Sequence, residues 1–217
     1  MSGHLGLFRS DDRRSAVKRL ERLALQSVNL ARLPRPVARF WVRALRAARA
    51  ANDTWSIDVA CRPAELRELL GAVDGARRVA EVGTAAAWTT SCLALADPER
   101  EVHSWDLTAH PMRERYLALL SPADRARVHL YDRPGGLGPA HPPEVDAVFI
   151  DSSHERAETI HTFRIWERSL APGGLIAFHD WQDPDYPQVT EAIRELGLRG
   201  EEHGHLFVWR KPAGAQA

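Results

Sequence analysis

The hydrophobic pattern of the chain changes near residue 78. Before that point, apolar residues recur at helical spacing, which predicts two amphipathic helices over residues 10–33 and 37–48. Residues 52–58 are polar and turn-like, and residues 63–70 predict a further short helix. The first part of the chain is therefore expected to be entirely helical.

From residue 78 onward, short apolar runs alternate with longer helical segments. This alternation is typical of repeated strand–helix–strand units and a parallel sheet. Strands are predicted over 78–82, 101–105, 128–131, 147–150, 175–178 and 206–210, and helices over 89–96, 112–120, 155–170 and 187–196. The pattern therefore predicts an α/β fold with a helical N-terminal extension.

The length of 217 residues suits one α/β domain with an appendage. We expect a basic helical cap or oligomerisation extension over 1–58, a ligand-binding domain over 59–212, and a disordered tail over 213–217. One catalytic domain is the simplest organisation for this length.

Charge is distributed unevenly although the net charge is zero. The first 51 residues hold twelve basic and three acidic residues, or +9, and the rest hold 17 basic and 26 acidic, or −9. A basic segment can mark a nucleic-acid contact. Because an acidic domain follows, we favour docking on the same chain or a second subunit, and expect a homodimer or higher homo-oligomer.

Composition argues against disorder and against a membrane protein. Hydrophobic residues make up 44% and charged residues 27%, close to the averages for globular proteins. No apolar run approaches the roughly 18–20 residues that span a bilayer, and residues 1–12 lack the apolar core of a signal peptide. We therefore expect a cytoplasmic protein, with Cys61 and Cys92 as ordinary reduced cysteines because neither has a CxxC or Cys/His spacing.

The first predicted strand ends in a pattern suited to ligand binding. Glu81 is followed by Gly83 and small residues before a helix, and Asp106 ends the next strand. Ligands of doubly wound sheets bind at the carboxyl ends of the strands, where a glycine permits close approach and an acid can accept hydrogen bonds from ribose hydroxyls. These residues indicate a nucleoside-containing ligand.

A nicotinamide-dependent oxidoreductase would also have a glycine after the first strand and an acid after the second, but it normally shows the motif G-x-G-x-x-G. Here Gly83 stands alone, with Ala85, Ala86 and Ala87 after it. A ligand with ribose and adenine but no pyrophosphate fits this loop better.

Two further motifs carry a family resemblance. The run DAVFIDSSH over 146–154, followed by LAPGG over 170–174 and HDW over 179–181, resembles class I S-adenosylmethionine-dependent methyltransferases. The closest likeness is to small O-methyltransferases of the catechol type and of bacterial natural-product and sugar pathways, over about residues 77–210. This resemblance implies a Rossmann-like seven-stranded sheet of order 3-2-1-4-5-7-6 with an antiparallel strand 7 at 206–210.

The resemblance also implies a cofactor, S-adenosyl-L-methionine, and residues that bind it. On this basis the methionine part is lined by Glu81, Gly83 and Thr84, Thr89 caps the next helix nearby, and Asp106 holds the ribose. Asp132 and Arg133 fall where adenine is often contacted, and Asp151 borders the same site. Ala87 departs from the family, which usually keeps a glycine there.

The predicted reaction centre lies where two neighbouring strands end. Asp151 ends one strand and His179 and Asp180 end the next, so their side chains should converge. In metal-dependent relatives the corresponding residues hold Mg²⁺, which lowers the pKa of the substrate hydroxyl. His179 departs from that pattern, because an imidazole suits Mn²⁺, Fe²⁺ or Zn²⁺ better or acts as a second base.

His154 follows Asp151 by three residues, where the resemblance places the general base. Its ordinary pKa near 6.5 suits proton transfer at neutral pH, although a helix-capping role is the alternative. Four aromatic residues could surround the methyl acceptor or simply pack: Trp55, His110, Trp181 and Tyr186.

The sequence therefore favours methyl transfer to a hydroxyl of a small molecule, in specialised biosynthesis, with a divalent metal and a histidine base. Two alternatives stay open. One is methylation of nitrogen or of RNA, which the basic extension alone supports. The other is a non-catalytic cofactor-binding partner, because Ala87 and His179 depart from the family pattern.

Overall fold

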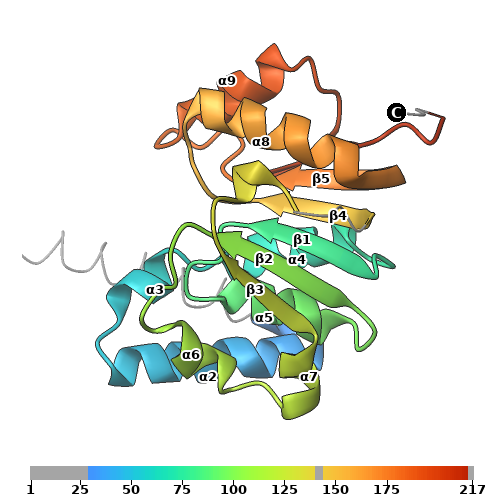
Figure 1. Cartoon of the computed structure of the whole chain (residues 1–217). Helices are drawn as coiled ribbons and strands as arrows, with labels where there is room; N and C mark the ends of the chain where they lie inside the picture. Colours follow the sequence, from blue (N-terminus) through green and yellow to red (C-terminus); the bar gives the residue numbers. More distant parts are fainter. Residues whose placement is uncertain (1–28, 140–143, 215–217) are drawn as a thin grey trace, which may run out of the picture.

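The computed structural model describes residues 29–139 and 144–214 (Figure 1). Most of the helix predicted over 10–33 lies outside these residues. Residues 29–31 are helical and a turn precedes Pro34, as the sequence predicted for the end of that helix.

Seven strands form one sheet in the order β3-β2-β1-β4-β5-β7-β6. Strand β7 runs antiparallel to both β5 and β6, and the other pairs are parallel. This arrangement confirms the predicted fold class and strand order. The strands are β1 (Arg78–Val82), β2 (Glu101–Asp106), β3 (Val128–Asp132), β4 (Val145–Ile150), β5 (Leu170–Phe178), β6 (Glu201–His203) and β7 (Leu206–Arg210).

Strand register brings the candidate site residues to one edge of the sheet. Val82 at the end of β1 pairs with Trp105 of β2 and Ile150 of β4, and Ile150 pairs with Phe178 of β5. The next residues along each strand therefore leave the sheet side by side. This edge is where a ligand of a doubly wound sheet binds.

Helices cover both faces of the sheet (Figure 1). The side chains of Val79, Phe149 and Ala177 point to one face and those of Ala80, Val148 and Ile176 to the other, as the two-residue period of strands requires. The first face packs against α2 (Arg35–Ala50), α4 (Pro63–Ala72) and α5 (Trp88–Ala96), and the second against α8 (Arg156–Ser169) and α9 (Pro187–Glu195).

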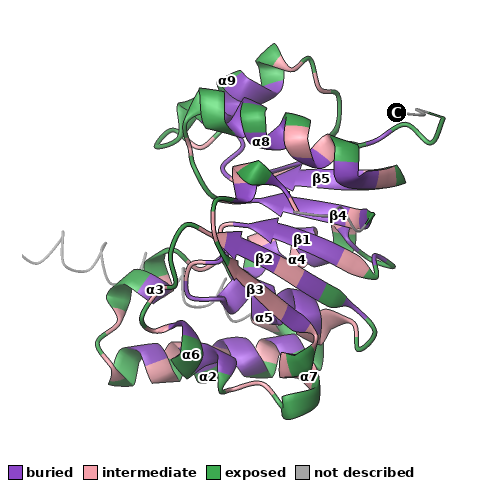
Figure 2. Cartoon of the chain, in the orientation of Figure 1, coloured by how far each residue is buried: buried purple, intermediate pink, exposed green. Residues whose placement is uncertain are grey.

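Helix α2 packs into the same core as the sheet. Its apolar stripe is buried, as Figure 2 shows, and Trp41 meets Trp88 of α5 edge to face with ring centroids 5.8 Å apart. The arginines of α2 occupy its exposed side. The described part of the extension thus docks on its own domain, while its predicted role in oligomerisation stays a prediction.

Several element boundaries differ from the prediction. Residues 52–58 are not simply turn-like, because α3 (Thr54–Asp58) forms there with the Asp53 side chain accepting from the Ser56 amide. The predicted helix over 112–120 is shorter, as α6 (Arg113–Leu117), and a second helix, α7 (Pro122–Ala126), follows with Ser121 as its cap. Strand β5 starts earlier than predicted, at Leu170.

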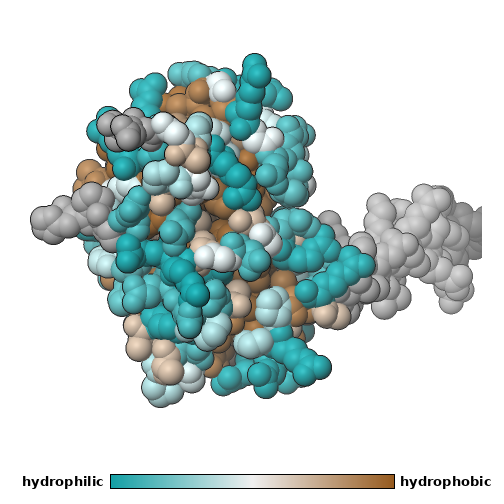
Figure 3. All heavy atoms as spheres, turned by 90° about the vertical axis from the view of Figure 1, so that its right-hand side faces the viewer, coloured by the Kyte–Doolittle hydropathy of each residue, from teal (hydrophilic) through white to brown (hydrophobic). Residues whose placement is uncertain are grey.

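The face on the right of Figure 1 carries mostly hydrophilic side chains with hydrophobic residues visible between them (Figure 3). Within the described ranges, no helix has both the length and the apolar character needed to cross a membrane.

Candidate active site

A cavity of about 790 Å³ opens at the carboxyl edge of the sheet. Its walls come from the segments that follow β1, β2, β3, β4 and β5, together with residues of α3 and α4. This volume lies in the range of small-molecule and cofactor sites, roughly 300–1,000 Å³. Most of the site residues predicted from the sequence line this cavity, and Glu81, Asp132 and Arg133 do not.

Gly83 sets the close approach of two strand ends. Its φ is +109°, and a Cβ at this position would lie 1.8 Å from the backbone oxygen of Asp151. No side chain can be accommodated there without moving the backbone of β1 or β4. The predicted requirement for glycine at this position therefore has a structural cause.

The loop after Gly83 is held by its contact with the second acid. The Ala85 amide, at a residue with φ +46°, donates to Oδ2 of Asp106 over 2.7 Å. Asp106, Thr84 and Thr89 all line the cavity, and their contact with a cofactor stays a prediction. The second carboxylate oxygen of Asp106 can accept from a ligand hydroxyl.

Ala87, where the family usually has glycine, adopts φ +63° and is fully buried. This left-handed conformation explains why glycine is common at such a position. Ala87 is not among the residues that line the cavity, so its methyl group packs into the core and does not narrow the site.

Glu81 lies beneath the cavity and is not one of its lining residues. Its Oε2 accepts from Ser104 Oγ over 2.5 Å and also from the Thr90 hydroxyl. Burial raises the pKa of Glu81 to about 8, against the effect of these two hydrogen bonds. The carboxyl group thus joins β1, β2 and α5, and its predicted contact with the cofactor stays a prediction.

The predicted adenine residues also lie off the cavity lining. Asp132 Oδ1 accepts from Arg113 Nη1 over 2.6 Å, and the Arg133 guanidinium lies 5.6 Å from the centre of the Tyr131 ring. The next residues, 134–136, line the cavity instead. The lining residues after β3 therefore begin one position after the predicted pair, Asp132 and Arg133.

The ends of β4 and β5 bring four polar side chains together, as the sequence predicted. Asp180 bridges two histidines, with Oδ2 2.9 Å from His154 Nε2 and Oδ1 3.1 Å from His179 Nδ1. Asp151 Oδ1 lies 3.3 Å from the same His179 nitrogen. All four residues line the cavity.

Carboxylates face both ring nitrogens of His179. Nδ1 faces Asp151 and Asp180, and Nε2 lies 3.4 Å from Oε2 of Glu65 in α4. Burial lowers the pKa of His179, but these carboxylates outweigh it and raise the pKa well above its usual range. Three carboxylates therefore surround the His179 imidazole and favour its protonated form.

Sequence reasoning missed Glu65. It predicted the helix over 63–70 without assigning that helix a role, and 114 positions separate Glu65 from His179. Glu65 also accepts from the Arg62 amide over 3.0 Å, as part of the N-terminal cap of α4. The capping pattern was a visible signal, but it does not predict a contact with β5.

His154 packs against an aromatic ring at the mouth of the cavity. Its imidazole stacks on Tyr186 with ring centroids 3.8 Å apart. The hydrogen bond with Asp180 raises the pKa of His154 above its ordinary value, against a smaller opposing effect of burial. Helix α8 begins after His154, with Glu155 at the N-cap position.

Three of the four aromatic residues considered for the acceptor line the cavity. Trp55 stacks on His110 with centroids 4.1 Å apart, and Tyr186 lies on His154. Trp55 and Tyr186 are 46% and 39% exposed, which is unusual for large aromatic side chains that only pack. Trp181 is buried against Phe207 and does not line the cavity.

One group of cavity residues has the donor atoms of a metal site. Asp151, His179 and Asp180 each offer a ligand atom, and these atoms lie within 4.8 Å of one another. Two carboxylates and one imidazole are a donor set that divalent cations accept. The residues present therefore fit the predicted metal.

Comparison with known proteins agrees with this geometry. Residues 80–181 match the family model described as "Methyltransferase domain". A protein of Acanthamoeba polyphaga mimivirus, itself uncharacterised, is 34% identical over 56 residues, which are 25% of this chain and 25% of that protein.

Solved structures share the fold at low identity. A Nostoc punctiforme protein described as a candidate O-methyltransferase superposes with TM-score 0.55 and 13% identity, over 67% of this chain and 55% of that one. A TDP-rhamnose 3'-O-methyltransferase of calicheamicin biosynthesis gives 0.54 and 16%, over 89% and 94%.

A Burkholderia thailandensis N1-methyltransferase, solved with S-adenosylhomocysteine, also gives 0.54 and 16%, over 83% and 92%. The family match over the sheet and its ligand edge agrees with the strand order of the whole domain. Residues 80–181 therefore resemble methyltransferase domains, and the chain has the strand order and fold of class I methyltransferases.

Proposed function

We propose that the chain transfers a methyl group from S-adenosylmethionine to a hydroxyl of a small molecule. The observation that carries this proposal is the His154–Asp180 pair, 2.9 Å apart, beside Asp151 and in the same cavity as Asp106. This arrangement places a candidate base in the cavity that would hold the methyl donor.

Residues at the ends of β1 and β2 fit the cofactor. Gly83, Thr84 and Thr89 would border its methionine part, and the free oxygen of Asp106 would accept from the ribose hydroxyls. The backbone of residues 134–136 would border the adenine, since these residues line the cavity after β3. The sulfonium of the bound cofactor supplies an electrophilic methyl group.

The tautomer of His154 follows from its partner. A carboxylate only accepts hydrogen bonds, so Nε2 carries the proton donated to Asp180 and Nδ1 keeps its lone pair. Nδ1 is then free to accept the proton of an acceptor hydroxyl in the cavity. Asp180 stabilises the imidazolium that forms, which is the role of the orienting acid in a base–carboxylate pair.

Asp151 and Asp180 would hold a divalent cation such as Mg²⁺ through carboxylate oxygens, with His179 adjacent. Such an ion, when bound, lowers the pKa of the acceptor hydroxyl and orients its oxygen. Asp180 keeps Oδ2 for His154, and its Oδ1, which faces His179 Nδ1, would turn to the ion. The protein would then position the acceptor while His154 receives its proton.

The charge of the cavity favours a small acceptor over a nucleic acid. Eight carboxylate residues line the cavity, and Arg62 is the one lysine or arginine among the lining residues. A phosphate backbone needs basic contacts, so this wall would repel it. The exposed rings of Trp55 and Tyr186 favour an acceptor with an aromatic or apolar part.

Nitrogen methylation is the second candidate. The O-methyltransferase and the N1-methyltransferase superpose equally well on this chain, with TM-score 0.54 each, so the fold does not select the acceptor atom. An amine acceptor would also suit the acidic cavity. The acceptor atom has to be read from a product.

The test is a comparison of turnover with a panel of hydroxylated and aminated small molecules, measured as S-adenosylhomocysteine formed. His154→Ala should lower turnover by about 10²–10⁴-fold, the usual contribution of a general base. His203→Ala, outside the cavity on β6, should leave turnover unchanged. Equal turnover of wild type and His154→Ala would remove the assignment of the base.

A further inference from the structure

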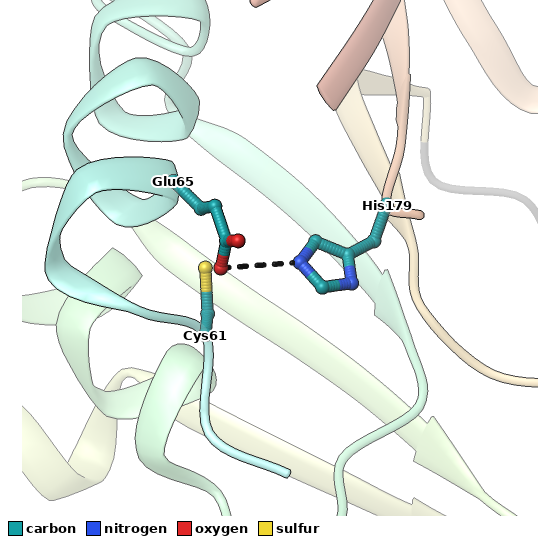
Figure 4. Close-up of side chains that lie close together, drawn as sticks. All are labelled: Cys61, Glu65 and His179. Atoms are coloured by element: carbon teal, nitrogen blue, oxygen red, sulfur yellow. Dashed lines mark hydrogen bonds and ion pairs between the residues drawn. The ribbon is translucent and has the colours of Figure 1, made fainter. Parts of the chain in front are cut away.

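A second set of ligand atoms surrounds the other nitrogen of His179. The Nε2 side of the ring faces α4 and the segment before it, where Glu65 and Cys61 lie (Figure 4). One ligand atom from each of these three residues falls within 4.8 Å of the other two. This cluster shares His179 with the reaction centre but contains none of its aspartates.

We propose that Cys61, Glu65 and His179 Nε2 bind a zinc-type divalent cation. Zinc is commonly bound by sulfur, imidazole nitrogen and carboxylate oxygen, and three protein ligands with a fourth open position are typical of its reactive sites. Glu65 and His179 line the cavity, so the fourth position faces the space where an acceptor binds. A water molecule or an acceptor oxygen would complete the tetrahedron.

The groups around this cluster have the arrangement of an outer coordination shell. A histidine that binds a metal usually donates its other N–H to a carboxylate. His179 Nδ1 lies 3.1 Å from Asp180 Oδ1 and 3.3 Å from Asp151 Oδ1, so either can accept that proton. The Glu65 carboxylate is also oriented by a neighbour, because the Arg62 amide donates to its Oε2 over 3.0 Å.

The Cys61 sulfur makes only a weak hydrogen bond within the described residues. Cys61 is 4% exposed, and its thiol lies 3.9 Å from the carbonyl oxygen of Arg62. Burial raises the pKa of this thiol. On metal binding a sulfur–metal bond and a nitrogen–metal bond form, and the thiol proton and the Nε2 proton of the His179 imidazolium leave to the solvent, so two protons are released for each ion bound.

The two candidate metal sites around His179 differ in their ligand atoms, since one has only carboxylates beside the imidazole and the other includes a thiol. A neutral imidazole has a single lone pair, so His179 can serve a metal through Nε2 or through Nδ1, but not both. The carboxylate oxygens of Asp151 and Asp180 suit Mg²⁺, whereas a thiol with an imidazole suits Zn²⁺ or Co²⁺. The proposal therefore does not depend on the identity of the methyl acceptor.

Titration of the full chain with Co²⁺ tests the proposal, because a thiolate–cobalt bond gives a near-ultraviolet charge-transfer band. Wild type should show this band at one ion per chain. Cys61→Ser should abolish it, whereas Cys92→Ser, which removes the other buried cysteine, should keep it. Asp151→Asn should also keep it, since the amide oxygen still accepts from Nδ1–H, while losing Mg²⁺ affinity.

Glu65→Gln supplies a second variant of nearly the same shape. This substitution should weaken Zn²⁺ binding by more than roughly 10-fold, as measured by competition with a chelator. Loss of a residue that only supports a ligand already costs about 10-fold in affinity, and loss of a ligand should cost more. Absence of the band in wild type, an unchanged band in Cys61→Ser, or Zn²⁺ binding that neither variant weakens would overturn the proposal. Because the readout is the metal, failure here is distinct from failure of methyl transfer.

Discussion

At the end of β1, Gly83 shows how one missing side chain shapes the site. The backbone of Asp151 occupies the space that a Cβ would need, so Gly83 is what allows β1 and β4 to end side by side. Asp151 is thereby positioned over the cavity. The same sequence signal, a glycine after an apolar strand, predicted the loop but not this contact.

Gly83→Ala should destabilise the protein by about 2–5 kcal/mol, from the left-handed backbone and the clash together. Gly75→Ala is the matched control, because Gly75 also has a positive φ, +74°, but open space around its Cβ position. Urea denaturation measures both. Equal losses in the two variants would mean that the contact with Asp151 carries no cost.

Glu81 is the residue whose burial should appear in a pH profile. Its folded-state pKa, about 8, lies above the ordinary 4.5, so the folded protein holds a proton that the unfolded chain releases. Its contribution to stability is therefore complete below pH 4.5 and is lost as the pH rises through 8.

Glu81→Gln removes this titration while keeping the shape of the side chain. The stability of wild type relative to Glu81→Gln should fall by about 5 kcal/mol between these pH limits. Denaturation curves of both proteins at several pH values measure it. A difference that does not change with pH would show that Glu81 is not protonated in the folded protein.

At the scale of elements, α2 and α3 play different parts although both precede the sheet. Trp41 of α2 is buried against Trp88, whereas Trp55 of α3 is 46% exposed beside the cavity. The first belongs to the core and the second to the rim of the site. The sequence predicted the apolar stripe of α2 but gave no sign that α3 is helical.

Trp41→Ala and Trp55→Ala should therefore separate stability from substrate binding. Truncation of a buried tryptophan costs about 3–5 kcal/mol, so Trp41→Ala should lower the free energy of unfolding by that amount. Trp55→Ala should leave stability within about 0.5 kcal/mol and raise KM for the acceptor. A large loss of stability in Trp55→Ala would place that ring in the core.

Prediction of elements succeeded where a strand or helix is periodic over its whole length. All the strands that carry site residues were predicted, because their apolar runs are short and bounded by polar turns. Helix α7 was not predicted because its five residues, Pro122–Ala126, bury no side chain and so form no apolar stripe. Strand β6 was not located because its three residues, Glu201–His203, are polar and partly exposed.

Across the whole molecule, the site depends on contacts between distant parts of the chain. Sequence reasoning found Asp151, His179 and Asp180 because they follow predicted strands, and it found His154 because the family resemblance places the base there. Glu65 and Cys61 escaped because only folding brings α4 beside the end of β5. Residues on strand ends can be predicted from topology, whereas those on covering helices need the packed structure.

The cavity also determines how the molecule should respond to its cofactor. S-adenosylhomocysteine would bind residues from the ends of β1, β2 and β3, which belong to separate parts of the chain. A ligand that binds only the folded state stabilises it by mass action, by about 2.7 kcal/mol at a hundred times Kd. A rise in Tm with ligand concentration should follow.

The central claim is that this cavity binds the methyl donor through Asp106, and calorimetric titration with S-adenosylhomocysteine tests it most directly. Wild type should bind one molecule per chain. Asp106→Ala should weaken binding by roughly 10–100-fold, the effect of losing hydrogen bonds to a carboxylate. Asp132→Ala, which alters an acid paired with Arg113 off the cavity lining, should change the affinity by less than about threefold. No binding by wild type, or equal affinity of wild type and Asp106→Ala, would contradict the account.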